Sequence, residues 1–141
     1  MTAFHPGPGA KRPMRIFVVE NHEDTRFLLC LLLEQLGHTV FSAPSLGGAL
    51  EAMPAARCDV LISDIGLPDG NGWDLMTRLG DARPPYAIAM SGFGMSSDRQ
   101  RSLNVGYRHH LLKPVEPNQL ERLLDEAADE TRESERGRSV T

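Results

Sequence analysis

The sequence predicts an α/β domain in which helices cover both faces of a five-stranded parallel sheet. Between residues 15 and 128, five short apolar runs alternate with five segments that have helical periodicity. The runs are typical of strands that are buried on both faces of a parallel sheet. Right-handed crossovers between such strands give a doubly wound sheet. The 141 residues suffice for one core of this kind and are too few for two ordinary domains.

The first half of the chain contains three of the expected strands, at residues 16–19, 39–41 and 60–64. The helix between the first two should span residues 24–36 and stop at Gly37. Its core-facing residues at helical spacing are expected to be Leu28, Leu31, Leu32 and Leu36. Ser45 can cap the next helix, which should run to about residue 53. The inward residues of that helix are expected to be Leu46, Ala49, Leu50 and Met53.

The second half begins with a loop at residues 68–72, indicated by its Pro, Asp and Gly content. A helix at 73–79 should follow, with Leu75, Met76 and Leu79 facing the core. The last two strands are expected at 86–91 and 109–112, with a weakly apolar helix at about 96–104 between them. Pro117 suits the first position of the final helix. The inward residues of this helix are expected to be Leu120, Leu123, Leu124, Ala127 and Ala128.

The two ends of the chain differ in composition from the middle. Residues 1–13 are rich in Pro and Gly and lack periodicity, so we expect a flexible leader. The sequence leaves open whether Met14 is the native start. Residues 130–141 are charged and poor in apolar side chains, so we expect a disordered tail. The ordered domain should therefore span residues 14–129.

Composition excludes several classes of function. The formal net charge of −4 argues against a protein that binds nucleic acid through a basic face. No apolar run approaches the roughly 20 residues that a membrane span needs. The N-terminus lacks the order of charges and apolar residues found in a signal peptide. Cys30 and Cys58 show no metal-binding spacing, which favours reduced thiols and a cytoplasmic location.

Polar residues follow four of the expected strands. Glu20 and Asn21 come after the first strand, Asp64 ends the third, Ser91 ends the fourth, and Lys113 follows the fifth. Because the carboxyl ends of parallel strands share one edge of a sheet, we expect these side chains to meet in a small cleft. A carboxylate, an acid/amide pair, a hydroxyl and an ammonium group would together suit a phosphoryl group carried on Asp64.

The segments around these residues resemble the receiver domain of two-component response regulators, over about residues 14–128. They read Val-Val-Glu-Asn at 18–21, Ser-Asp-Ile-Gly-Leu-Pro at 63–68, Met-Ser-Gly at 90–92 and Leu-Lys-Pro at 112–114. Each motif alone is weak, but the four in this order are a strong signal. Residues 106–115 are similar to receivers attached to hybrid histidine kinases and to their single-domain relatives. The resemblance implies a flavodoxin-like fold.

The resemblance also implies roles for the cleft. Asp64 would take a phosphoryl group from a histidine kinase or a histidine phosphotransfer protein. The implied ligands of a Mg²⁺ ion are Glu20, Asn21, Asp64 and the backbone carbonyl of Gly66. Lys113 would bind one phosphoryl oxygen and Ser91 would donate a hydrogen bond to another. The peptide bond between Lys113 and Pro114 would be cis.

Two residues depart from the family pattern. Receivers usually carry two acids after the first strand, and Asn21 replaces the second of these with a neutral oxygen ligand. We therefore expect weakened Mg²⁺ affinity with phosphorylation retained. His110 occupies the place where receivers often have a Tyr or Phe that turns inward when the hydroxyl moves. A switching role for His110 and a partly exposed strand histidine are both left open.

Three functional interpretations follow. The first is a response regulator that accepts phosphate and acts by contact with an unknown downstream protein, without turning over a separate substrate. The alternative is a pseudo-receiver that binds partners without phosphorylation, which the Glu20–Asn21 pair favours. A small hydrolase ranks last, because no second acid follows Asp64 to act as a general acid. Whether the protein forms a homodimer is left open.

The apolar run at residues 27–33 has two interpretations. With the core face assigned as above, Leu29, Cys30 and Leu33 would lie nearer the outer side of the helix. They could extend a wide core stripe under neighbouring loops, or they could form a docking surface for a phosphate donor. We expect the wide core stripe.

Overall fold

The computed structural model describes residues 12–92 and 96–140, with side chains described as far as Thr131. The strands of its main sheet are β1 (Arg15–Val19), β2 (Thr39–Ala43), β3 (Val60–Asp64), β6 (Tyr86–Ser91) and β7 (His109–Leu112). All pair in parallel, in the order β2-β1-β3-β6-β7. The predicted doubly wound parallel sheet is thus confirmed.

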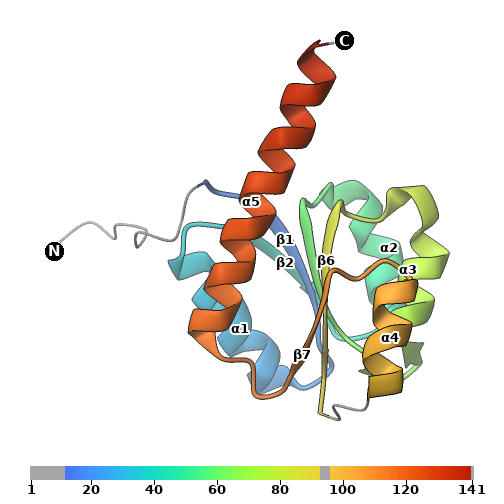
Figure 1. Ribbon diagram of the computed structural model, residues 1–141. Helices are drawn as coiled ribbons and strands as arrows, with labels where there is room; N and C mark the ends of the chain where they lie inside the picture. Colours follow the sequence, from blue (N-terminus) through green and yellow to red (C-terminus); the bar gives the residue numbers. More distant parts are fainter. Residues whose placement is uncertain (1–11, 93–95, 141) are drawn as a thin grey trace, which may run out of the picture.

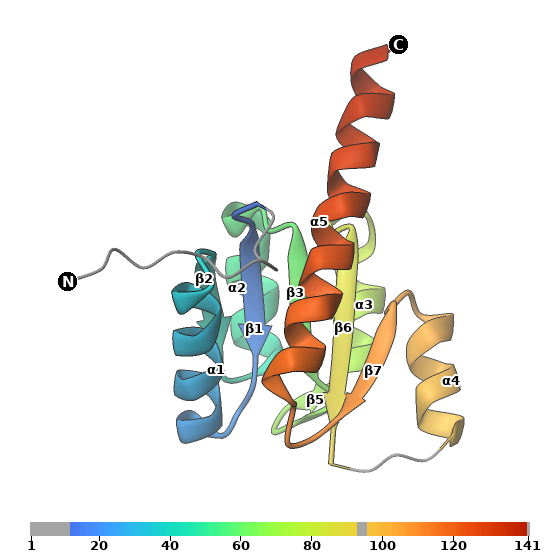
Figure 2. The ribbon, with the colours of Figure 1, turned by 60° about the vertical axis from the view of Figure 1, so that its left-hand side comes forward.

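The helices form one layer on each face of this sheet (Figure 1). They are α1 (Glu23–Gln35), α2 (Leu46–Ala56), α3 (Gly72–Leu79), α4 (Ser96–Asn104) and α5 (Pro117–Val140). A 3₁₀ turn, η1 (Gly80–Ala82), follows α3. Figure 2 shows α1 and α5 in front of the sheet and α4 at its edge, beside β7. None of the helices in the described part of the chain is both long and apolar enough to cross a membrane.

Two hydrophobic clusters hold these layers together. In β1, Ile16 and Val18 pack toward α1 and α5, whereas Phe17 and Val19 pack toward α2 and α3. Alternate residues of a strand point to opposite faces, so a strand covered on both faces must be apolar throughout. All four of these side chains are at most 1% exposed. The continuous apolar runs in the sequence therefore arise, as predicted, from strands that are buried on both faces of the sheet.

Local signals set most element boundaries. The side chain of Ser45 caps α2 by accepting the backbone N–H of Gly48 at 3.0 Å. That helix continues past the expected end at about residue 53 and stops at Ala56. Pro54 lies in its last turn, where a proline removes a single backbone N–H donor. The segment expected to be a loop, residues 68–72, contains the short strand β5 (Gly70–Asn71), which pairs antiparallel with β4 (Gly66–Leu67) just before that segment. The last turns of α5 extend beyond the sheet in both views (Figures 1 and 2).

The expected core face of α1 was wrong for Leu28 and Leu31, whereas Leu32 and Leu36 are partly buried and pack against the core as expected. Leu29 and Leu33 are buried, whereas Leu28 and Leu31 are exposed together with Phe27. A run of seven apolar residues offers several equivalent core faces, so its periodicity cannot fix the rotation of the helix. Two contacts hold the start of α1. The side chain of His22 caps the helix, and Arg26 donates to the carbonyl oxygen of Glu20 at 2.8 Å.

The structure describes the C-terminal boundary expected for the domain but little of the N-terminal leader. The first eleven residues of the proposed leader lie outside the described residues. At the other end, α5 does not stop near Glu130 but continues as a helix to Val140. Good helix formers fill much of this segment, and a helix that is anchored by a buried first half needs little further energy to propagate.

Candidate functional site

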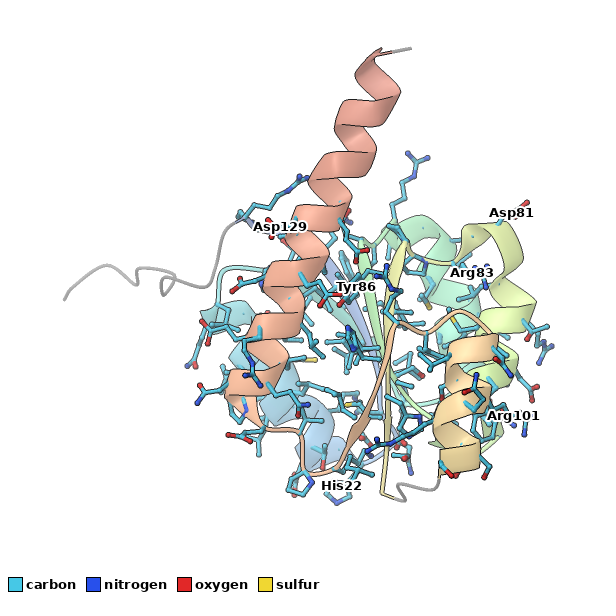
Figure 3. The ribbon with its side chains drawn as sticks, viewed as in Figure 1. His22, Asp81, Arg83, Tyr86, Arg101 and Asp129 are labelled. Carbon is cyan, nitrogen blue, oxygen red and sulfur yellow. The ribbon has the colours of Figure 1, made fainter. Side chains whose placement is uncertain are left out.

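The candidate site lies at the edge of the sheet where the parallel strands end. Asp64 is the last residue of β3 and Ser91 the last of β6, while Glu20 directly follows β1 and Lys113 directly follows β7. Figure 3 labels His22, which marks this lower end of the sheet at the start of α1. Four chain segments that are far apart in the sequence thus deliver four polar side chains to one place.

Lys113 joins two buried acids. Its ammonium nitrogen lies 2.7 Å from Oδ2 of Asp64 and 2.5 Å from Oε1 of Glu20. Glu20 is fully buried and Asp64 is 6% exposed, so neither charge is well hydrated. A buried carboxylate requires a cation or hydrogen-bond donors in place of water. One lysine therefore compensates two carboxylates, and the three groups together carry a formal charge of −1.

Backbone N–H groups hold the remaining carboxylate oxygens. His22 donates its N–H to Oε2 of Glu20 at 2.9 Å. Gly66 donates its N–H to Oδ1 of Asp64 at 3.3 Å. Each acid thus has one oxygen on the lysine and one on the chain, which fixes the orientation of both carboxylates.

The pKa values in the site follow from burial and from this sharing. Burial raises the pKa of Asp64, and the nearby Glu20 adds to the rise, against the opposing effect of Lys113. Burial alone would lower the pKa of Lys113, but its bonds to Asp64 and Glu20 outweigh burial and raise it. The lysine is therefore firmly charged, whereas the Asp64 carboxylate is harder to ionise than a solvated one.

The site offers oxygen donors to a hard cation. Glu20 and Asp64 supply carboxylates. The exposed Asn21 directly follows Glu20 and has an amide oxygen, and the exposed Gly66 comes two residues after Asp64 and has a backbone carbonyl. An all-oxygen set of this kind fits Mg²⁺. The structure brings together only two acids, and the described residues contain no cluster of three or more acid, His or Cys side chains suited to a metal. The oxygen donors of the site thus suit Mg²⁺, but with Asn21 neutral the ligands carry less negative charge than a set with a second acid after Glu20.

Ser91, the last residue of β6, bonds to the ring of His110. Its Oγ is 2.7 Å from Nε2 of that histidine. The other ring nitrogen, Nδ1, lies 2.8 Å from Oγ of Ser102, which also accepts the indole N–H of Trp73 at 2.9 Å. Burial lowers the pKa of His110, Arg99 lowers it further, and Asp98 opposes both. The imidazole is therefore neutral near pH 7.

Sequence reasoning found the acids, the lysine and the hydroxyl, but it missed two members of this hydrogen-bonded group. Ser102 is one of several polar residues in a polar helix, and no pattern distinguishes it. Trp73 lies at the start of α3, and no sequence pattern distinguishes an indole that donates a hydrogen bond from one that only packs. The peptide bond between Lys113 and Pro114 is cis.

Comparison with known proteins identifies the family. The family model described as the response regulator receiver domain matches residues 16–125. The chain belongs to this family. Receiver domains are signalling modules of two-component systems, and the fold and the resemblance found in the sequence are both confirmed.

Relatives of this receiver include proteins of very different length. It is 36% identical over 118 residues to an uncharacterized 14.6 kDa protein in the sodA1 3′ region of Leptolyngbya boryana, covering 80% of this chain and 88% of that one. It is 32% identical to the virulence sensor protein BvgS of Bordetella bronchiseptica, covering 82% of this chain but 10% of the sensor. A similar domain thus occurs both in a short protein and as a small part of a long one.

A solved structure supports the same assignment. The crystal structure of a CheY-like response regulator receiver domain protein from Methanospirillum hungatei superposes with a TM-score of 0.81 at 27% identity. The superposition covers 87% of this chain and 99% of that one. Nearly the whole described domain therefore follows the receiver fold.

Proposed function

We propose that this receiver accepts a phosphoryl group on Asp64 from the phosphohistidine of a histidine kinase or histidine phosphotransfer protein, and that it signals by protein contact. The observation that carries this proposal is the Lys113 ammonium 2.7 Å from the buried Asp64 carboxylate, at the strand edge beside Ser91. A carboxylate with a fixed cation next to it suits phosphoryl transfer, which depends on positioning and charge neutralisation.

In the reaction, a carboxylate oxygen of Asp64 forms a bond to phosphorus while the P–N bond to the donor imidazole breaks. The electron pair of that bond stays on the imidazole nitrogen, and Asp64 becomes an acyl phosphate. Lys113 binds one oxygen of the transferred group as a point charge. Ser91, at the end of the neighbouring strand β6, donates a hydrogen bond to another oxygen of that group.

A Mg²⁺ ion is the proposed cofactor. Glu20, Asp64, the carbonyl of Gly66 and the amide oxygen of Asn21 would hold it, and the bound ion would supply positive charge to the transferring group. Lys113 now contacts both Glu20 and Asp64 directly. It must release part of this contact for a cation to bind, so we expect low Mg²⁺ affinity in the absence of phosphate.

The proposed surface for the phosphate donor is the exposed side of α1. Phe27 and Leu28 are 65% and 62% exposed, and Leu31 lies beside them. An apolar groove of about 650 Å³ runs from Leu28 to Val115 and reaches Lys113. Contiguous exposed apolar surface is typical of interaction sites. A donor helix seated on this side of α1 would thus lie next to the phosphoryl acceptor.

The test is the intact mass of the protein after incubation with acetyl phosphate and Mg²⁺. A gain of about 80 Da, the mass of one phosphoryl group, is expected in the parent and not in Asp64→Asn. Ser63→Ala, next to Asp64 in the same strand, is a matched control that should still be labelled, because Ser63 bonds to the backbone of Asp64 and not to its carboxylate.

A second candidate function is that of a pseudo-receiver, which binds partners without phosphorylation. The observation that favours it is Asn21, which stands next to Glu20 in place of a second acid. No mass gain in the folded parent, with a known receiver labelled in parallel, would refute phosphorylation on Asp64 and leave this second function.

A further inference from the structure

A chain of hydrogen bonds runs from α3 to the hydroxyl of Ser91. The indole nitrogen of Trp73 contacts Ser102 at 2.9 Å, Ser102 contacts Nδ1 of His110 at 2.8 Å, and Nε2 of His110 contacts Ser91 at 2.7 Å. The four residues belong to α3, α4, β7 and β6. Three elements outside the acceptor strand are thereby joined to a residue of the proposed phosphoryl site.

The direction of these bonds follows from the donors available. An indole N–H can only donate, so the Ser102 oxygen accepts from Trp73. Within the described part of the chain, the other partner of the Ser102 hydroxyl is Nδ1 of His110, so its hydrogen is donated there. A neutral imidazole that accepts at Nδ1 carries its hydrogen on Nε2. That hydrogen is donated to Ser91, and the hydroxyl hydrogen of Ser91 is then directed to an acceptor other than His110.

Ser102 has a special place in this chain. Of the described residues of α4, it is the buried one, with 0% of its surface exposed. The residue of α4 that faces inward therefore carries a hydroxyl group. A helix normally places apolar side chains on its inward face. Its partner Trp73 is held from outside by the guanidinium of Arg101, which lies 4.0 Å from the ring centre. Figure 3 shows Arg101 on α4.

We propose that Trp73, Ser102 and His110 are positioning residues that direct the Ser91 hydroxyl toward the phosphoryl group on Asp64. The inference rests on the proposed function of Asp64. Because every bond in the chain points the same way, each donor polarises the next, and the Ser91 hydroxyl becomes a stronger donor. His110 thus replaces a rotating aromatic side chain with a fixed connection between Ser91 and Ser102.

The charged surroundings agree with a neutral His110. Asp98 and Arg99 of α4 act on its charge, with the positive Arg99 having the larger effect. On its own strand, His109 makes contacts elsewhere, with Tyr86 and Glu126. In the acceptor site, Asp64 and Glu20 share the ammonium of Lys113, and these three groups together carry a formal charge of −1. Protonation of His110 would place a hydrogen on Nδ1 and remove the acceptor that Ser102 uses.

The experiment has two measurements: the tautomer of His110 by NMR, and the rate of phosphorylation by acetyl phosphate. Long-range ¹H–¹⁵N correlation spectra of the full chain should show the hydrogen on Nε2 in the parent. In Ser102→Ala, the two tautomers should mix, and the rate of phosphorylation by acetyl phosphate should fall about two- to tenfold, as expected for the loss of one hydrogen bond. Trp73→Phe should give a smaller fall, because it removes only the first donor. Ser97→Ala, at an exposed position of α4, should match the parent.

The outcomes separate the two proposals. A folded parent that is never phosphorylated would refute Asp64 as the acceptor. A parent that is phosphorylated but carries the His110 hydrogen on Nδ1 would overturn the relay alone. So would an unchanged rate in Ser102→Ala, a substitution that favours helix formation and keeps α4 intact. Ser102→Cys, with its weaker S–H donor, should restore part of the rate.

Discussion

The ammonium nitrogen of Lys113 lies 2.7 Å from Oδ2 of Asp64 and holds this carboxylate while it also bonds to the fully buried Glu20. The lysine side chain itself is 26% exposed. The two acids are therefore stable as a pair because of one cation that solvent can still reach. Any change that removes this cation acts on two buried charges at once.

Lys113→Met should accordingly destabilise the protein. Removing one partner of a buried ion pair costs about 3–5 kcal/mol, and the partial exposure of Lys113 should reduce this to about 2–3 kcal/mol. Asp64→Asn should act in the opposite direction. Since the fold raises the pKa of Asp64, its ionised form is disfavoured in the native state, and a neutral amide removes that cost at pH 7. Urea denaturation measures both changes.

The pH dependence provides the control for this comparison. A carboxyl with a raised native pKa lowers stability as the pH rises through that pKa, and it causes no loss well below it. The advantage of Asp64→Asn over the parent should therefore shrink as the pH falls through the range where Asp64 becomes protonated. An advantage that grows in acid, or a Lys113→Met variant as stable as the parent, would contradict this account of the shared cation.

Asn21→Asp tests the metal site. A second acid next to Glu20 raises the ligand charge, so Mg²⁺ affinity should increase about tenfold, measured by isothermal titration calorimetry. Without metal the same substitution adds a like charge near Glu20 and Asp64, so the variant should unfold at lower urea concentration in EDTA than the parent. Added Mg²⁺ should reverse this difference. Equal Mg²⁺ affinity in the two proteins would show that residue 21 is not a ligand.

The strand ends were predictable because a parallel sheet fixes them. Asp64 and Ser91 had to reach the same edge once their strands were buried on both faces and paired in parallel. The rotation of α1 was not predictable, because its apolar run is continuous and offers several alternative core faces. Ser102 could not be found either, since its partners come from other elements.

The corrected rotation of α1 leads to a prediction about its two sides. Leu29→Ala, at a buried position, should cost about 2–5 kcal/mol of stability, as is usual for truncating a core leucine. Leu28→Ser, at the neighbouring exposed position, should change stability by less than about 0.5 kcal/mol. Urea denaturation of the two variants checks the assignment, and equal losses would show that Leu28 also packs in the core.

The same exposed leucine separates two routes of phosphorylation. If a donor protein docks on α1, Leu28→Ser should slow transfer from a phosphorylated donor while labelling by acetyl phosphate continues at the parental rate. The small phosphate donor needs no docking surface, so it isolates the chemistry at Asp64 from recognition. Equal transfer from the protein donor to the parent and to Leu28→Ser would place the docking surface elsewhere.

His38 should make the protein less stable in mild acid. It is buried, and its Nδ1 accepts the backbone N–H of Met14 at 3.0 Å, which only an unprotonated nitrogen can do. Burial lowers its pKa, so between the native pKa and the unfolded value of about 6.5 the unfolded chain binds more protons. Stability should then be complete above that unfolded value and fall as the pH drops below it. Unfolding free energies measured between pH 7.5 and 5 should show a smaller slope in His38→Gln than in the parent. Equal slopes in the two proteins would contradict this account.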